Sequence, residues 1–222
     1  MVRWLRNLFY RASLGNHAYR FLFEPGPPGE IVVLDCETTG LNPRTDEVIA
    51  VAAVIIKGHR IMTSSPFRAV IRPDKDPTST SIKVHRLRAQ DVAEGRAMRE
   101  VLPGLLRFIG GRPIAGYYID FDIRMLDKYV LHFIEAKLPN PRIEVSSMYY
   151  ALKYSGAPPG TVHDLRFASM LADLGIPSLA QHDAFNDAVM TAMMYVQLRD
   201  MQKRGARISR ARTVYQNAPI GA

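Results

Sequence analysis

Two acidic residues two positions apart follow a short apolar run, and this spacing could serve metal chemistry. Residues 31–34 read Ile-Val-Val-Leu, a run typical of a strand buried on both faces, and Asp35 and Glu37 come next. Because alternate side chains of a strand point to one face, both carboxylates would point the same way. Neighbouring carboxylates repel each other, and a cation such as Mg²⁺ or Mn²⁺ relieves that repulsion. The pattern predicts a cation site at the end of a central strand, although two acids alone also fit a solvated strand end.

Further acidic residues stand at the start of two predicted helices. Asp120 and Asp122 follow the apolar run at 114–117, whereas Asp183 and Asp187 open the last long helix. An acid near a helix N-terminus is often a cap or a partner of the helix dipole. Taken singly, each of these acids is therefore better explained by capping than by metal binding.

The combination of these residues resembles the DEDDh, or DnaQ-like, 3′–5′ exonucleases, a family that includes the proofreading epsilon subunit of DNA polymerase III. The resemblance runs from about residue 31 to residue 198. It rests on three motifs, which are Asp35-x-Glu37-Thr-Thr-Gly, the pair Phe121-Asp122, and His182 with Asp187 five residues later. The first motif is the most specific of the three and the middle one the least specific.

The resemblance implies a ribonuclease H-like α/β fold, in which helices flank a mixed central sheet built from an antiparallel meander plus parallel strands. It implies a general base, His182, beside two divalent metal ions, Mg²⁺ or Mn²⁺, which are bound by Asp35, Glu37, Asp122 and Asp187. The residues that match the nucleotide-binding positions are Thr38, Leu41, His85, Tyr118 and Phe121.

Two acids close to these motifs are set aside. Asp120 also stands beside Phe121, but the family pattern has Phe followed by Asp and so selects Asp122. Asp183 lies four residues before Asp187, on the same helix face. Because Asp183 falls at the predicted helix start, we expect it to be the helix cap.

A second His-Asp pair imitates the third motif. His163 and Asp164 repeat the order of His182 and its neighbour, yet Ala168 stands five residues after His163. This pair therefore lacks the metal ligand, and we expect Asp164 to be another cap. We expect His182 itself to lie on the loop before its helix, where it could approach water.

Two departures from the family pattern concern substrate contacts and not ligands. Tyr117 and Tyr118 stand where many members have His-Asn, so a nucleotide contact there must be altered, with ring stacking as one replacement. Ser146 and Ser147 stand where an Asp-Thr pair is often found. The sister class has Tyr four residues before the last Asp, and that position here is Asp183, which supports the His variant.

The elements that would position these residues follow from hydrophobic periodicity and turn residues. After the first strand, two more strands at 48–56 and 61–71 are joined by a hairpin loop at 57–59 and complete an antiparallel meander. Short strands are predicted at 114–117 and 143–145. Helices are predicted from residue 85 to 109 with interruptions at Gly95 and Pro103, and at 120–136, 147–154, 165–174 and 183–203.

Composition fits one basic globular domain. The chain has 222 residues, a formal net charge of +8 and a pI of about 9.7, which favours nucleic acid or an anionic membrane surface as partner. No apolar stretch approaches the length of a membrane-spanning helix. The single cysteine, Cys36, excludes an internal disulfide framework and suits a reducing, cytoplasmic location.

We divide the chain into four parts. Residues 1–24 form a basic amphipathic arm, 25–30 a Pro/Gly linker, 31–207 the exonuclease domain and 208–222 a basic tail. The arm could lie on a membrane surface, dock a partner or pack back on the domain, and we favour packing back.

These observations predict an exonuclease that removes nucleoside 5′-monophosphates from the 3′ end of single-stranded nucleic acid by a two-metal mechanism. We take DNA as the substrate and a DNA polymerase as a possible partner. The alternatives are an RNA-trimming 3′–5′ exoribonuclease of the same family and a non-catalytic module that binds nucleic acid or a polymerase. An RNase H-type endonuclease is disfavoured by Thr38, Thr39, Gly40 and His182.

Overall fold

A mixed five-stranded sheet forms the centre of the protein in a computed structural model, which describes residues 10–11, 14–74, 92–180 and 182–210. The strand order is β3-β2-β1-β4-β5. The first three strands form the predicted antiparallel meander and the last two run parallel to β1. The strands are β1 (Glu30–Thr38), β2 (Val48–Lys57), β3 (Arg60–Val70), β4 (Ile114–Gly116) and β5 (Arg142–Glu144). The mixed sheet and its order confirm the predicted fold class.

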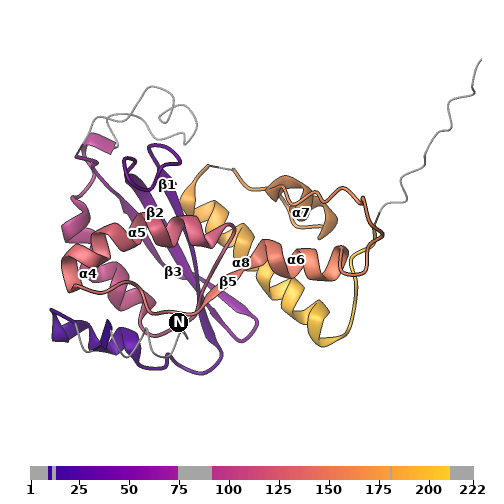
Figure 1. Cartoon of the computed structure of the whole chain (residues 1–222), viewed down its shortest axis with the longest axis horizontal. Helices are drawn as coiled ribbons and strands as arrows, with labels where there is room; N and C mark the ends of the chain where they lie inside the picture. The colour runs from indigo at the N-terminus through magenta and orange to yellow at the C-terminus, as the bar shows by residue number, and fades with distance from the viewer. Residues whose placement is uncertain (1–9, 12–13, 75–91, 181, 211–222) are drawn as a thin grey trace, which may run out of the picture.

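Helices cover both faces of this sheet (Figure 1). The helices are η1 (His17–Phe23), α4 (Met98–Ile109), α5 (Ile119–Ile134), α6 (Val145–Lys153), α7 (Phe167–Asp173) and α8 (Ala184–Lys203). One hydrophobic cluster joins the sheet to η1, α4 and α5, and a second joins its other face to α6, α7 and α8. Within the described residues, no helix has the length and apolar character needed to cross a membrane.

The side chains of β1 alternate between these two clusters. Val32, Leu34 and Cys36 pack against α4 and α5, whereas Ile31 and Val33 pack against α6 and α8. The residues that continue the second series are the two acids of the first motif, which therefore emerge on the α8 side. Cys36, which stands between them, lies on the opposite face and is buried against α4 and α5.

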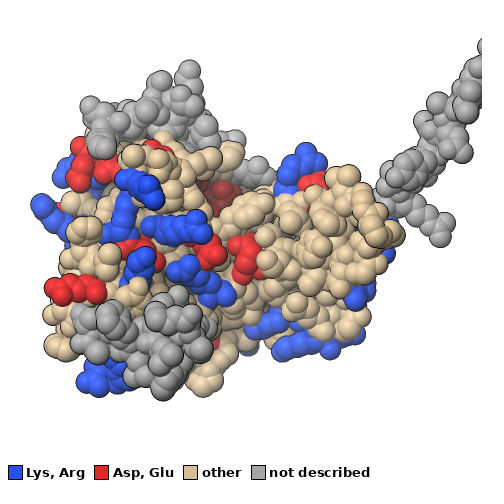
Figure 2. Space-filling view, viewed as in Figure 1, with Lys and Arg blue, Asp and Glu red and all other residues tan. Residues whose placement is uncertain are grey.

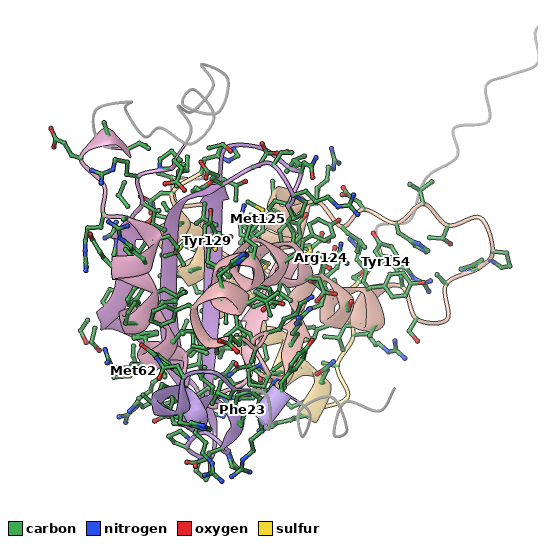
Figure 3. All side chains as sticks on the ribbon, turned by 60° about the vertical axis from the view of Figure 1, so that its left-hand side comes forward. Phe23, Met62, Arg124, Met125, Tyr129 and Tyr154 are labelled. Carbon is green, nitrogen blue, oxygen red and sulfur yellow. The ribbon has the colours of Figure 1, made fainter. Side chains whose placement is uncertain are left out.

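Side-chain polarity matches the packing of α5. Met125 is fully buried against the sheet, whereas the neighbouring Arg124 is exposed (Figure 3). The helix therefore presents an apolar face to β1 while its N-terminal turn stands at the edge of the sheet where β1 ends.

The predicted interruption at Pro103 is wrong, because this residue is the sixth of α4. A proline inside a helix removes one backbone hydrogen bond and costs about 3 kcal/mol. The apolar face of α4 offsets that cost, since Val101, Leu102, Leu105 and Leu106 are all buried in the core. The part of the prediction that covers residues 75–91, including His85, lies outside the described residues.

The described part of the N-terminal arm packs on the domain, as predicted. Leu14, Tyr19 and Leu22 are buried in the cluster formed with α4 and α5. The ring of Tyr19 meets the ring of Phe133 edge-on, with 5.2 Å between their centroids. Residues 14–23 thus contribute to the same hydrophobic core as the sheet.

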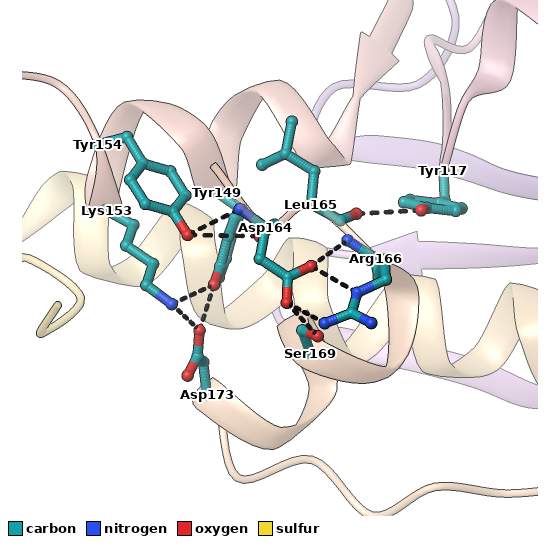
Figure 4. Close-up of polar contacts among 9 residues, drawn as sticks. All are labelled: Tyr117, Tyr149, Lys153, Tyr154, Asp164, Leu165, Arg166, Ser169 and Asp173. Carbon is teal, nitrogen blue, oxygen red and sulfur yellow. Dashed lines mark hydrogen bonds and ion pairs between the residues drawn. The ribbon is translucent and has the colours of Figure 1, made fainter. Parts of the chain in front are cut away.

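Polar contacts join α6 to α7 and to the loop between them (Figure 4). Asp173 accepts hydrogen bonds from Tyr149 and Lys153. Asp164 accepts hydrogen bonds from the backbone and the guanidinium of Arg166, just before α7. This network lies in the α6–α7 layer and involves none of the motif residues.

Candidate active site

Three of the motif acids converge where β1 meets α8. Asp35 and Glu37 come from the end of β1, and Asp187 is the fourth residue of α8. One carboxylate oxygen of each lies within 4.8 Å of the others. The spacing in the first motif and the packing of α8 on β1 bring together side chains from opposite ends of the domain.

Asp122 joins the group from the other face of the sheet. It is the fourth residue of α5 and only 4% exposed. The backbone N–H of Cys36, between the two acids of β1, lowers the pKa of its carboxylate. Its carboxylate lies near enough to Asp35 to raise the pKa of that residue, although the group within 4.8 Å contains only Asp35, Glu37 and Asp187.

Burial and mutual repulsion make these acids hard to ionise together. Burial, then repulsion from Asp122 and Glu37, raises the pKa of Asp35 well above its usual range. Burial likewise raises the pKa of Asp122, although backbone N–H groups oppose the shift. Burial raises the pKa of Asp187 to about 6, against the lowering effect of a backbone N–H from His182. A positive charge among them would reverse these shifts.

One carboxylate oxygen has no hydrogen-bond donor among the described residues. Asp187 Oδ2 accepts the backbone N–H of His182 at 3.1 Å, whereas its buried Oδ1 has no partner. A buried polar atom without a partner is rare in native proteins. Clustered carboxylate oxygens are the donors that Mg²⁺ and Mn²⁺ prefer, so these residues fit a divalent cation.

His182 lies on the loop that leads into α8, as predicted. Its backbone is left-handed, with φ of 63°, and the residue is exposed. Asp183 caps the helix by accepting the backbone N–H of Asn186 at 2.9 Å, which confirms the predicted cap. His182 and Glu37 line one hollow of about 230 Å³, so the imidazole borders the carboxylate cluster.

Asp120 and His163, which resemble motif residues in the sequence, lie outside the carboxylate cluster. Asp120 forms an ion pair with Arg142 at 2.7 Å. The ring of His163 packs against Tyr150 and Tyr154, with centroids 5.0 and 4.7 Å away. Neither side chain joins the carboxylate cluster.

The predicted substrate contacts in β1 and its loop differ in exposure. The Thr38 hydroxyl is buried and donates to the carbonyl of Gly40 at 2.7 Å. Leu41 is 85% exposed, which leaves its side chain available to a ligand.

The predicted contacts near α5 also differ. Tyr118 is 55% exposed, and its ring lies 4.4 Å from that of Tyr117, whose hydroxyl donates to Leu165 O at 3.0 Å. Phe121 is half-buried against the α4–α5 cluster. His85 lies outside the described residues.

The hollow beside His182 contains two residues that the sequence does not single out. Arg68 of β3 lies over the ring of Phe185, 4.4 Å from its centroid, and 3.9 Å from a carboxylate oxygen of Asp183. No local pattern marks Arg68, because its place beside α8 depends on the pairing of β3 with β2.

The sequence matches the profile of an exonuclease family and several proteins named as DNA polymerase III. The profile of the RNase T family, described as an exonuclease, matches residues 32–195. The epsilon subunit of DNA polymerase III from Aquifex aeolicus is 27% identical over 173 residues, which cover 77% of this chain and 80% of that protein. The PolC-type DNA polymerase III of Thermotoga petrophila is 26% identical over 200 residues, 90% of this chain but 13% of the polymerase. The chain thus spans only a small part of the PolC-type relatives.

Solved structures share the fold. E. coli exonuclease I in complex with a dT13 oligonucleotide superposes with a TM-score of 0.65 at 18% identity, covering 79% of this chain and 42% of that one. Exonuclease X in complex with 5′ overhanging duplex DNA gives 0.59 at 20% identity, covering 80% and 95%. The solved structures share this fold, and the family profile spans well over half of the sequence. The chain therefore belongs to the RNase T family of exonucleases.

Proposed function

We propose that the protein hydrolyses the last phosphodiester bond at the 3′ end of single-stranded DNA and releases a nucleoside 5′-monophosphate. The observation that carries this proposal is the convergence of Asp35, Glu37 and Asp187 within 4.8 Å, together with the unpartnered Oδ1 of Asp187. RNA is the second candidate substrate, because no residue described above distinguishes the two sugars.

The four carboxylates would hold two divalent cations, Mg²⁺ or Mn²⁺. Bound cations would stabilise negative charge on the attacking and leaving oxygens of the phosphate. Asp35 and Glu37 approach from the sheet, Asp122 from α5 and Asp187 from α8. Because the acids come from rigid elements, they would meet the cations with little rearrangement.

His182 would accept the proton of the attacking water. An imidazole suits this role because it exchanges a proton near neutral pH. The exposed loop position supports the assignment, since the side chain can reach both the solvent and the hollow beside Glu37.

The terminal nucleotide would lie against residues that neighbour Glu37 at the end of β1 and Asp122 at the start of α5. Thr38 would contact the 3′-terminal nucleotide, and Leu41, Phe121 and His85 would border its base. The exposed ring of Tyr118, beside the start of α5, could stack on a base without reading its identity.

Basic residues would hold the rest of the strand. Lys and Arg side chains gather on the face that α4 and α5 share (Figure 2). A groove of about 610 Å³ on these helices is lined by Arg44, Arg99 and Lys128 together with Tyr129 and Phe133. Cationic groups beside aromatic rings suit single-stranded nucleic acid and bind phosphates regardless of sequence.

The relatives suggest a setting for this activity. Several are named DNA polymerase III subunit epsilon or PolC-type DNA polymerase III, which supports a DNA polymerase as partner and a cytoplasmic location.

End-labelled oligonucleotides test the proposal directly. With Mg²⁺ or Mn²⁺, 5′-labelled single-stranded DNA should shorten stepwise, whereas 3′-labelled DNA should release labelled mononucleotide at once. RNA oligonucleotides of the same sequence, labelled in the same way, would decide between the two candidate substrates. Asp35→Asn and Asp187→Asn variants should lose activity while keeping their fold by circular dichroism. Full activity after metal stripping in excess EDTA, or internal cleavage of both labelled strands, would contradict the proposal.

The metal-free protein should become more stable as the pH falls from 6 to 4. The pKa of Asp187 is about 6 in the folded protein and 3.8 in the unfolded chain. Between these two values the folded protein therefore keeps a proton that the unfolded chain has lost. The raised pKa values of Asp35 and Asp122 act in the same direction. Thermal unfolding in EDTA should therefore give a Tm a few degrees higher at pH 5 than at pH 7. Asp187→Asn should reduce this difference in Tm. The same difference in Tm in the variant and the wild type would show that the pKa of Asp187 is not raised in the folded protein.

Replacement of the general base should slow hydrolysis without preventing cation binding. We expect His182→Ala to lower kcat by about 10²–10⁴-fold, the usual effect of losing a general base. His163→Ala is the matched control, because it alters the similar His-Asp pair that lies among tyrosines. Rates and their pH profiles would be measured at saturating Mn²⁺. Near-normal turnover in His182→Ala combined with loss in His163→Ala would contradict the assignment.

A further inference from the structure

The carboxylate of Glu144 binds the N-terminal ends of two helices. Its Oε1 accepts the backbone N–H of Tyr118 at 3.1 Å and its Oε2 accepts that of Ile119 at 3.0 Å. Oε1 also accepts the backbone N–H and the hydroxyl of Ser146, at 3.0 and 2.7 Å. Tyr118 and Ile119 begin α5, and Ser146 lies in the first turn of α6.

The start of α5 depends on this contact because it has no cap of its own. Tyr118 occupies the N-cap position, where its side chain makes no capping hydrogen bond and its backbone is left-handed, with φ of 53°. The first N–H groups of a helix have no partner inside the helix. A carboxylate that accepts them from outside satisfies these donors, and its charge is favoured by the positive ends of both helix dipoles.

The same turn fixes the position of Asp122. This residue lies three positions after Ile119, less than one helical turn away, and it is almost fully buried beside the end of β1. The chain reaches α5 through Gly116, where a Cβ atom would lie 2.6 Å from the side chain of Ile119 and 3.1 Å from a carbonyl of β1. There is therefore no room for a side chain at Gly116, where the chain enters α5. Glu144 holds the same turn by accepting the backbone N–H groups of Tyr118 and Ile119.

Glu144 also connects the two layers of helices. Glu144 is the last residue of β5, and it pairs with Gly116 of β4. The first turn of α5 belongs to the layer on one face of the sheet, whereas α6 packs with α8 on the other face. One carboxylate thus ties the helix that carries Asp122 to the layer that carries Asp187.

We infer that Glu144 is a positioning residue of the active site, which holds the start of α5 so that Asp122 meets the cation shared with the acids of β1 and α8. This inference rests on the proposed cation site. Glu144 lies outside the three motifs, and in this proposal it touches neither the cation nor the substrate.

The test compares Mn²⁺ binding to the full-length variants by calorimetry. Glu144→Ala should weaken Mn²⁺ binding by about 10–100-fold, the usual effect of losing the support of a metal ligand. It should also lower kcat and leave the KM for an oligonucleotide nearly unchanged. Glu144→Gln keeps one acceptor oxygen and should fall between Glu144→Ala and the wild type. Removing the charge alone would make Asp122 easier to ionise and strengthen binding, so a loss reports positioning.

Two controls separate positioning from a general loss of stability. Asp164→Ala removes a carboxylate that binds Arg166 and Ser169 at the start of α7, a helix without motif acids, and should leave Mn²⁺ binding unchanged. In a double-mutant cycle, Asp122→Asn with Glu144→Ala should bind Mn²⁺ no more weakly than Asp122→Asn alone. If Glu144→Ala does not fold, the same cycle is run with Glu144→Gln.

The outcomes are distinct. Wild-type Mn²⁺ affinity in the Glu144 variants, or effects of Glu144 and Asp122 that multiply in the cycle, would overturn the inference while leaving the proposed function intact. A wild-type protein that binds no Mn²⁺ would overturn both.

Discussion

Carboxylates that repel one another are held together at the end of β1 by the packing of three separate segments. In water such groups would ionise and move apart, but here burial and mutual repulsion keep the pKa values of Asp35, Asp122 and Asp187 raised. The fold tolerates this unfavourable contact because large apolar surfaces on both faces of the sheet are buried around it. A site that is destabilising without a cation and favourable with one is the arrangement expected where function and stability compete.

The geometry of the sheet explains how the acids meet. Alternation along β1 sends Asp35 and Glu37 to the α8 side and Cys36 to the α5 side. Strands β1 and β4 run parallel, so the helix that follows β4 begins at the same edge of the sheet where the first motif ends. The start of α8 reaches this edge from the opposite layer. Each motif therefore occupies the end of a regular element, where side-chain direction is set by backbone geometry.

Most of the fold could be predicted from the sequence because it depends on local spacing, whereas the four acids are selected by the resemblance to an exonuclease family. The meander, the helix through Asp122 and the long helix after Asp183 follow from periodicity and caps. The predicted interruption at Pro103 is wrong because the tendency of proline to end a helix is outweighed by the burial of the apolar face of α4. The prediction for His85 lies outside the described residues.

Residues whose roles depend on tertiary pairing could not be found in this way. Arg68 belongs to an ordinary strand, and only the pairing of β3 with β2 and the start of α8 bring it beside His182. Glu144 resembles any acid before a helix, and only the parallel pairing of β4 and β5 places it against α5. Local sequence indicates which groups can do chemistry, whereas the contacts that hold them depend on segments distant in the chain.

Anomalous diffraction from crystals soaked in Mn²⁺ tests most directly whether the four carboxylates form one site that holds two divalent cations. Two anomalous peaks are expected within ligand distance of Asp35, Glu37, Asp122 and Asp187. Peaks only elsewhere on the molecule, or no peak among these carboxylates at Mn²⁺ concentrations that support hydrolysis, would contradict the proposed site.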